Sequence, residues 1–472
     1  MRRDLFVTVT PQETAAGLCF ASARELARSI RAREVSAREV MIAHLAQIDR
    51  LNPALNAIVA RLDGQQCLAL ADDADRRLAG GEPVGPLHGL PIAFKDLEAA
   101  VGFPFTRGSP IFAHETPAED TVLVRRLRNA GVIPIGKTNV PELGMGSHTY
   151  NNVYGTTLNP YDVTKSAGGS SGGAAVAVAT GMLPCADGSD LGGSLRNPGS
   201  FNNVVGFRPT FGLVPVEPAP VPFVGFGVKG PIARTVEDAA FLLSVMADSD
   251  FSGPLDRDFT NVRVAWCPDL GGLPLDPRVR GVLARQRQTV EDLGCRVDDV
   301  CPDLEAADTV FLDIRLWMSS YNHAPLVERH RERLKPEALW EIETGSKLSA
   351  ADVASVLARH GELLERMRRF QDDYEFLLCT VNQVPPFDAS IAWPAEIDGV
   401  RMEHYIAWMK STYWISATRC PAISVPAGFT EDGLPVGLQI VGRPGDDLGV
   451  LQLAHAFEQA TGFGRRKASL CV

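Results

Sequence analysis

The chain has 472 residues, 45% hydrophobic and 22% charged, which is enough to bury a sizeable core. Its net charge is −11, from 46 basic and 57 acidic residues, and this argues against a phosphate backbone as the main partner. No stretch reaches the roughly 18 uninterrupted apolar residues of a membrane span. Residues 1–10 lack the apolar run and cleavage site of a signal peptide. These features predict a cytoplasmic protein that binds neither nucleic acid nor membrane.

The nine cysteines are an odd number without a C-x-x-C pair, and the nine histidines form no H-E-x-x-H motif. In a chain of this length, such cysteines indicate reduced thiols that mostly fill the core. We therefore expect no metal ion and no cofactor. Small molecules are the expected partners, and the sequence leaves a homodimer open.

Helical and extended patterns alternate along both ends of the chain. Capping boxes begin at Ser22 and Ser36, and Thr235 precedes a further helix. The other expected elements are a strand at 90–94, a helix at about 120–130, and strands at 132–135, 422–425 and 436–441. The alternation predicts an α/β fold, in which a mixed central sheet is flanked by helices on both faces.

Residues 255–415 differ from the rest, because their helices are rich in arginine and glutamate and contain no glycine cluster. The longest helical pattern there covers 351–371. We expect an inserted, variable and mostly helical lobe that shapes the substrate pocket, within a single domain of residues 1–472.

Two short motifs match known patterns without the required context. Residues 131–138 have the letters of a phosphate-binding loop, but the four residues between its glycines are Val, Ile, Pro and Ile, which favour a buried strand. Residues 168–172 have the letters of a nucleophile elbow, yet polar residues precede them where a hydrophobic strand is needed. Neither match predicts a function.

A longer constellation carries more information. Residues 168–173 read Gly-Gly-Ser-Ser-Gly-Gly, and residues 187–198 read Asp-Gly-Ser-Asp-Leu-Gly-Gly-Ser-Leu-Arg-Asn-Pro. Residues 206–210 read Gly-Phe-Arg-Pro-Thr, and Lys95 lies upstream in Phe-Lys-Asp. Together they resemble the amidase signature family over roughly residues 20–250 and 420–470. The chain departs from the family pattern at four places, which bear on pocket shape: Ser189, Asn197, Asn202-Asn203 and Arg208.

The serines and the lysine of these motifs are residue types that amide cleavage requires. A serine hydroxyl attacks an amide only if it loses its proton to a nearby base. No histidine lies near the constellation in sequence, but Lys95 can be that base if burial lowers its pKa from about 10.4. The resemblance implies Ser194 as nucleophile, Ser170 as proton relay after a cis peptide bond, and Lys95 as base. If burial lowers the lysine pKa to roughly 7.5–8.5, the rate should rise with pH over that range.

The resemblance also implies the surroundings of these groups. It places the developing oxyanion against the backbone N–H groups of residues 191–194, and the substrate against residues 144–146. From their positions alone, we expect Ser171 to cap the helix that follows it, and we expect an ion pair that flanks the turn to brace it. The residues concerned are Leu191, Gly192, Gly193 and Ser194; Gly144, Met145 and Gly146; and Ser171, Asp190 and Arg196.

Three functions remain open. The first is an amidase that cleaves small hydrophobic or aryl amides through an acyl-enzyme at Ser194, with esters, anilides or carbamates as further substrates. One or two aromatic residues of the lobe would then line its pocket, from among Trp317, Tyr321, Tyr405, Trp408, Tyr413 and Trp414. The second is an amidotransferase A-type subunit that releases ammonia from glutamine in a tRNA-dependent complex, which the acidic charge disfavours. The third, an inactive binding protein, is disfavoured because Lys95, Ser170 and Ser194 are all present.

Overall fold

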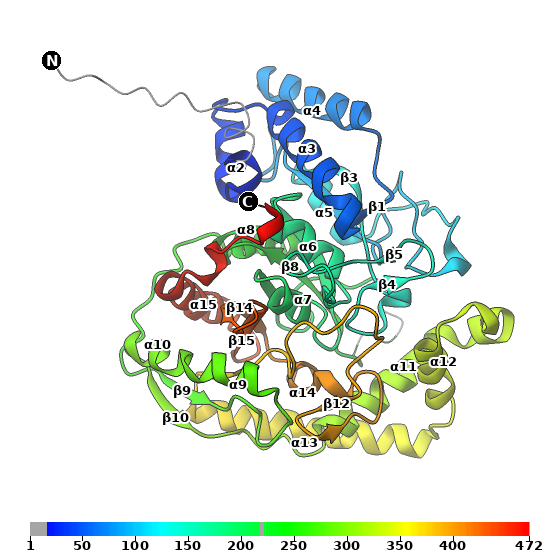
Figure 1. The fold of residues 1–472 in the computed structure, drawn as a ribbon, viewed down its shortest axis with the longest axis vertical. Helices are drawn as coiled ribbons and strands as arrows, with labels where there is room; N and C mark the ends of the chain where they lie inside the picture. The colour runs from blue at the N-terminus through cyan, green and yellow to red at the C-terminus, as the bar shows by residue number, and fades with distance from the viewer. Residues whose placement is uncertain (1–16, 218–220, 222, 472) are drawn as a thin grey trace.

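Two sheets form the frame of the protein in a computed structural model that describes residues 17–217, 221 and 223–471 (Figure 1). The prediction made for the start of the chain concerns residues 1–10, which lie outside this part. The large sheet has the strand order β10-β9-β11-β15-β14-β7-β8-β6, and the small one β1-β3-β2. Their strands are β1 (Ile58–Val59), β2 (Pro91–Lys95), β3 (Ile133–Thr138), β6 (Cys185–Asp190), β7 (Val205–Arg208), β8 (Val228–Ala233), β9 (Arg263–Trp266), β10 (Arg296–Asp299), β11 (Phe376–Thr380), β14 (Ala422–Phe429) and β15 (Pro435–Val441).

The helices surround these sheets. In chain order the α-helices are α2 (Ala23–Arg31), α3 (Ala37–Leu55), α4 (Gly64–Ala79), α5 (Val122–Asn129), α6 (Gly172–Ala179), α7 (Arg196–Phe201), α8 (Val236–Ala247), α9 (Pro277–Ala284), α10 (Gln286–Asp292), α11 (Ala307–His330), α12 (Pro336–Gly345), α13 (Ala350–Asp373), α14 (Lys410–Ala417) and α15 (Asp447–Thr461). Figure 1 shows α11–α13 at one end of the molecule and α2–α4, in blue, at the other.

The large sheet is mixed, as the sequence predicts. β9 runs parallel to both β10 and β11, whereas the pairs from β11 to β6 are antiparallel. The strands predicted at 422–425 and 436–441 are β14 and β15, which pair with Ile423 opposite Ile440. The segment with the letters of a phosphate loop contains β3, so its apolar residues form a buried strand.

Both faces of the large sheet are covered, because alternate residues of a strand point to opposite faces. In β11, Phe376 and Leu378 belong to the core that α8, α9, α10 and α15 cover, whereas Leu377 and Cys379 belong to the core under α11, α13 and α14. This alternation confirms the prediction of helices on both faces.

The small sheet meets the edge of the large one at Lys95. This residue ends β2, an edge strand, and its backbone N–H donates to the Asp187 carboxylate at 3.2 Å. Asp187 lies on β6, the edge strand of the large sheet. A buried carboxylate thus satisfies a strand N–H where the two sheets adjoin, and the Lys95 side chain emerges at this junction.

Residues 255–415 contribute strands as well as helices, because β9, β10 and β11 of the large sheet come from this range. These strands have only four or five residues, so the local sequence gives little sign of them. The longest helical part is 307–373, apart from short connections.

The structure corrects the expectation of nine reduced thiols. Cys267 and Cys301 form a disulfide with their Cα atoms 5.2 Å apart. Each cysteine follows a strand, and the parallel pairing of β9 with β10 brings the two together, which their spacing in the sequence does not show.

The close approach of β7 to the segment before α7 generates a stability prediction. A Cβ added at Gly206 would lie 2.2 Å from the carbonyl oxygen of Leu195, so Gly206→Ala must displace backbone. We expect the free energy of unfolding in urea to fall by about 1–3 kcal/mol, the usual effect of overpacking. The control is Gly281→Ala in α9, where no atom lies within 4 Å of the added Cβ. A helix-interior alanine should stabilise by about 0.5–1 kcal/mol, and equal effects of the two variants would contradict this account.

Candidate active site

Lys95 is fully buried, and its nitrogen is surrounded by serine hydroxyls. Nζ lies 2.9 Å from Ser170 Oγ, 2.7 Å from Ser171 Oγ and 2.9 Å from Ser189 Oγ. Two other buried lysines face carboxylates instead: Lys137 pairs with Asp96 at 3.4 Å, and Lys229 pairs with Glu98 at 2.7 Å. Lys95 takes part in no ion pair within the described chain. The side-chain partners of Lys95 Nζ are therefore neutral hydroxyl groups, which do not stabilise a positive charge as a carboxylate would.

Burial lowers the pKa of Lys95 to about 7, although Asp187, Asp190 and Glu98 act in the opposite direction. Removing an ammonium from water disfavours its charged form, and hydroxyl groups compensate for only part of that loss. The direction of the shift and its cause, burial, are those expected from the sequence. A large fraction of Lys95 is consequently neutral, and able to accept a proton, near pH 7.

The two serines at the start of α6 are oriented by a tight backbone path. The Gly169–Ser170 peptide bond is cis, as the family resemblance implies. Ser171 is the residue before the helix, but its hydroxyl makes no capping bond and instead faces Lys95. Its backbone N–H donates to the carbonyl oxygen of Ser194 at 3.2 Å. This bond joins the segment of Ser170 to the turn that carries Ser194.

A buried carboxylate holds the turn at Ser194. Asp190 ends β6 and accepts from the Gly193 N–H at 2.7 Å, and from Arg196 Nη2 at 2.9 Å and Nε at 3.0 Å. Arg208 adds Nη1 at 3.1 Å. Burial alone would raise the pKa of Asp190, but the two guanidinium groups hold it well below its usual range. The predicted Asp190–Arg196 pair is present, and Arg208 completes a cluster that fixes the turn.

The structure shows which backbone N–H groups of this turn are free to bind an anionic oxygen. The Gly193 N–H is already donated to Asp190, so it is not free for a substrate in this arrangement. The N–H groups of Leu191, Gly192 and Ser194 make no hydrogen bond to the residues that the structure describes. Gly192 allows a close fit, since a Cβ there would meet the Phe311 ring at 2.6 Å. These three N–H groups are the ones available to an anionic oxygen.

Ser170 and Ser194 both open into a cavity of about 280 Å³, which we call the serine cavity. Ser194 is 8% exposed, whereas Ser170 is 2% and Lys95 0% exposed. Gly144 and Met145 line the cavity as expected, but Gly146 does not: its Cα faces the Tyr405 ring. The lining also includes six further apolar side chains, Leu97, Leu143, Leu191, Val216, Val228 and Met318. None of the six lobe aromatics lines it, because Tyr405, Trp408 and Tyr413 pack into the core instead.

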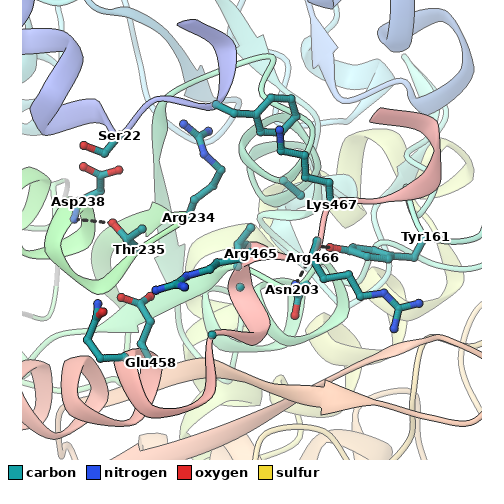
Figure 2. Close-up of a pocket in the computed structure, with 16 residues that line it drawn as sticks. Ser22, Tyr161, Asn203, Arg234, Thr235, Asp238, Glu458, Arg465, Arg466 and Lys467 are labelled. Atoms are coloured by element: carbon teal, nitrogen blue, oxygen red, sulfur yellow. Dashed lines mark hydrogen bonds between the residues drawn. The ribbon is translucent and has the colours of Figure 1, made fainter. Parts of the chain in front are cut away.

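A larger cavity of about 380 Å³ lies elsewhere, between residues 462–467 and the starts of α2 and α8. Figure 2 shows its basic side chains pointing apart, with Arg465 directed toward Glu458 and Arg466 away from it. Arg234 donates to three backbone carbonyls, and Lys467 lies over the Phe20 ring. Ser22 and Lys467 both line this cavity, but no hydrogen bond joins them, so size alone does not identify the candidate site.

Two participants were missed by sequence reasoning. Ser189 was noted only as a departure from the family, yet its hydroxyl contacts Lys95. Asp187 is part of the motif but has no role assigned from the sequence, yet it accepts the backbone N–H of Lys95. Burial raises the pKa of Asp187 to about 7. The available signal was the spacing: residues 187 and 189 alternate with Gly188 along β6 and therefore share one face of the strand.

Comparisons with known proteins identify the family of this chain. The profile of the amidase family matches residues 39–451. An acylamidase of Rhodococcus erythropolis is 35% identical over 96% of this chain and 98% of its own length, and the A-type subunit of a Cyanothece glutamyl-tRNA(Gln) amidotransferase is 34% identical over 95% and 100%. The crystal structure of a bacterial aryl acylamidase superposes with a TM-score of 0.89 at 26% identity, covering 96% of this chain and 98% of the other. The chain belongs to the amidase signature family. By class it is an amide hydrolase.

Two further observations concern the described residues only. No helix there has the length and apolar character that crossing a bilayer requires. The one group of side chains there with metal-ligand spacing is Cys267, Asp269 and Cys301, and its two cysteines are joined in the disulfide.

The Asp190 cluster generates a second prediction. Asp190→Asn would leave Arg196 and Arg208 buried without their counter-charge, so we expect a loss of about 3–5 kcal/mol in the free energy of unfolding. The matched control is Asp73→Asn, which breaks an exposed pair with Arg76 at 3.0 Å. Exposed pairs contribute at most about 1 kcal/mol, so the control should unfold close to the parent in urea. A loss no larger than that of the control would show that the cluster does not hold the turn.

Proposed function

We propose that this protein hydrolyses small neutral amides with apolar acyl or aryl groups, through an acyl-enzyme formed on Ser194. The observation that carries the proposal is the environment of Lys95: a buried amine with a pKa of about 7, held 2.9 Å from Ser170 Oγ beside the cavity that Ser194 faces. A base whose pKa lies near the working pH is best suited to remove the proton from a nucleophile.

The reaction follows from this arrangement in two halves. As Ser194 Oγ bonds to the amide carbon, its proton passes to Ser170 Oγ, and the Ser170 proton passes to Lys95 Nζ. The carbonyl oxygen takes up the negative charge beside the free N–H groups of Leu191, Gly192 and Ser194. The proton returns through Ser170 to the amine nitrogen, the C–N bond breaks, and the acyl group remains on Ser194. A water molecule then attacks the ester in the same manner and releases the acid.

The cavity limits the substrate to a small molecule. Its volume of about 280 Å³ lies at the lower end of the range of ligand pockets, and its apolar side chains favour alkyl or aryl groups. The names of the acylamidase and aryl acylamidase relatives point in the same direction. Since acyl transfer to serine does not depend on the leaving group being an amine, esters, anilides and carbamates are further candidate substrates.

The amidotransferase reading is the second candidate, because the two kinds of relative are almost equally similar to this chain. The net charge of −11 disfavours tRNA binding. Glutaminase activity, or stable association with amidotransferase partner subunits, would favour it over the proposed function.

We also propose that the chain acts as one domain. The large sheet takes strands from Cys185–Asp190 through Pro435–Val441, including three from the range 255–415. Helices α11 and α12 of that range contribute residues to the serine cavity, which supports its assignment as the segment that shapes the substrate pocket.

Substitutions in the three groups test the mechanism. Ser194→Ala removes the nucleophile and should abolish hydrolysis of anilides and p-nitrophenyl esters, while Ser170→Ala should lower kcat by about 10²–10⁴-fold because the proton loses its route. Both changes remove one oxygen, so circular dichroism and the melting temperature should stay close to the parent. Ser29→Ala, near the end of α2 and outside the serine cavity, is a control for the loss of a hydroxyl that donates to Glu34 at 2.8 Å. Residual activity near the parent in Ser194→Ala would refute the assignment.

The pH dependence tests the base. Lys95 acts in its deprotonated form, so kcat/KM should rise with pH through its folded-state pKa of about 7 and level off above it. His323 lines the same cavity, and burial lowers its pKa below the usual value, so a histidine base would give a limb at lower pH. We expect kcat/KM of His323→Asn to rise with pH near pH 7, as in the parent. We expect Lys95→Arg to be inactive at every pH, because arginine does not deprotonate. Loss of the limb in His323→Asn alone would contradict the lysine assignment.

A further inference from the structure

One face of α11 forms a wall of the serine cavity. Arg315, Met318, Ser319, Asn322 and His323 all line it, and their spacing of three and four residues is that of a single helix face. Arg315 is the cation of this face, and its side chain is only 10% exposed. A guanidinium lining a small cavity would ordinarily attract a carboxylate of the substrate.

In this protein the carboxylate that pairs with Arg315 comes from Glu341 of α12. Its carboxylate is fully buried and accepts from Arg315 Nε at 2.5 Å and from Ser319 Oγ at 2.6 Å. Tyr405 OH also donates to Glu341 and accepts from Arg315 Nη2 at 3.1 Å. Burial opposes the charge of Arg315, but Glu341 raises the pKa of the guanidinium above its ordinary value. The two side chains form a buried ion pair, in which the carboxylate offsets the charge of the guanidinium.

Two further carboxylates of the cavity wall lie beside cations. Glu98 pairs with Lys229, and Asp190 pairs with both Arg196 and Arg208. Glu217 lies exposed at the rim. The Nη1 atom of Arg315 makes no hydrogen bond to the described residues, so this end of the guanidinium is available to a ligand.

We propose that Glu341 determines the charge selectivity of the enzyme: by neutralising Arg315, it restricts the substrate to amides whose acyl group carries no charge. This rests on the proposed function, and it names the residue that sets the charge of the substrates accepted there. Without the Glu341 charge, Arg315 would present a partly desolvated cation to the cavity, where it would bind the carboxylate of an acyl chain such as succinyl.

The test compares two anilides with acyl groups of equal length, butyranilide and succinanilic acid. Parent enzyme should prefer butyranilide. In Glu341→Gln, which keeps the shape but removes the charge, the ratio of kcat/KM for the acid to that for butyranilide should rise by about tenfold or more. Because the ratio is taken within one variant, a general loss of activity cancels. In the double variant Arg315→Gln/Glu341→Gln, which removes both charges, the ratio should return to that of the parent.

A binding experiment separates this proposal from the proposed function. In the Ser194→Ala background, calorimetric titration with the same two anilides gives their affinities without turnover, and Glu341→Gln should shift the affinity ratio toward the acid. If the parent cleaves no anilide, ester or carbamate, the proposed function fails, while the affinity ratio still decides the role of Glu341. Should Glu341→Gln not fold, Arg315→Gln provides the opposite charge and should favour 4-aminobutyranilide over butyranilide. An unchanged ratio in a folded variant, or a parent that prefers the acid, would overturn the proposal.

Discussion

The burial of an amine without an anionic partner is the constraint on which the rest of this site depends. Lys137 and Lys229 are also buried, but each lies beside a carboxylate that stabilises its charge. Lys95 faces Ser170, Ser171 and Ser189 instead, so its neutral form is favoured near pH 7. Keeping lysine in this state is costly for stability, and it is the cost that makes a base available at that pH.

Two buried carboxylates, Asp187 and Asp190, fix the positions of Lys95 and of the turn that carries Ser194. Asp187 fixes the end of β2 to the edge of the large sheet through the Lys95 N–H, so the lysine approaches the serines from a rigid strand. Asp190 fixes the turn of Ser194 by a different means, a buried cluster with two arginines. Two carboxylates three residues apart on β6 thus have opposite electrostatic surroundings: burial raises the pKa of Asp187, whereas the guanidinium groups keep Asp190 ionised.

Around this centre the cavity combines apolar side chains with internally paired charges. The paired charges let polar residues such as Arg315 and Glu341 form a wall without presenting net charge to a ligand. Phe311 of α11 and Tyr413 of α14 do not line the cavity, because they stack in the core with ring centroids 4.5 Å apart. We therefore propose that the selectivity of this site depends on the pairing of Arg315 with Glu341.

The sequence by itself determined the family, the alternating α/β organisation and the three groups at the centre, because the glycine, serine and lysine pattern is local and each motif lies within a few residues. Tertiary structure alone decided what depends on distant segments. It brought Ser189 and Asp187 to Lys95, paired Glu341 with Arg315 across two helices, and drew three short strands from the range 255–415 into the sheet. It also turned Gly146 and the lobe aromatics away from the cavity. Short strands and buried ion pairs gain their stability from partners far along the chain, so the local sequence carries little trace of them.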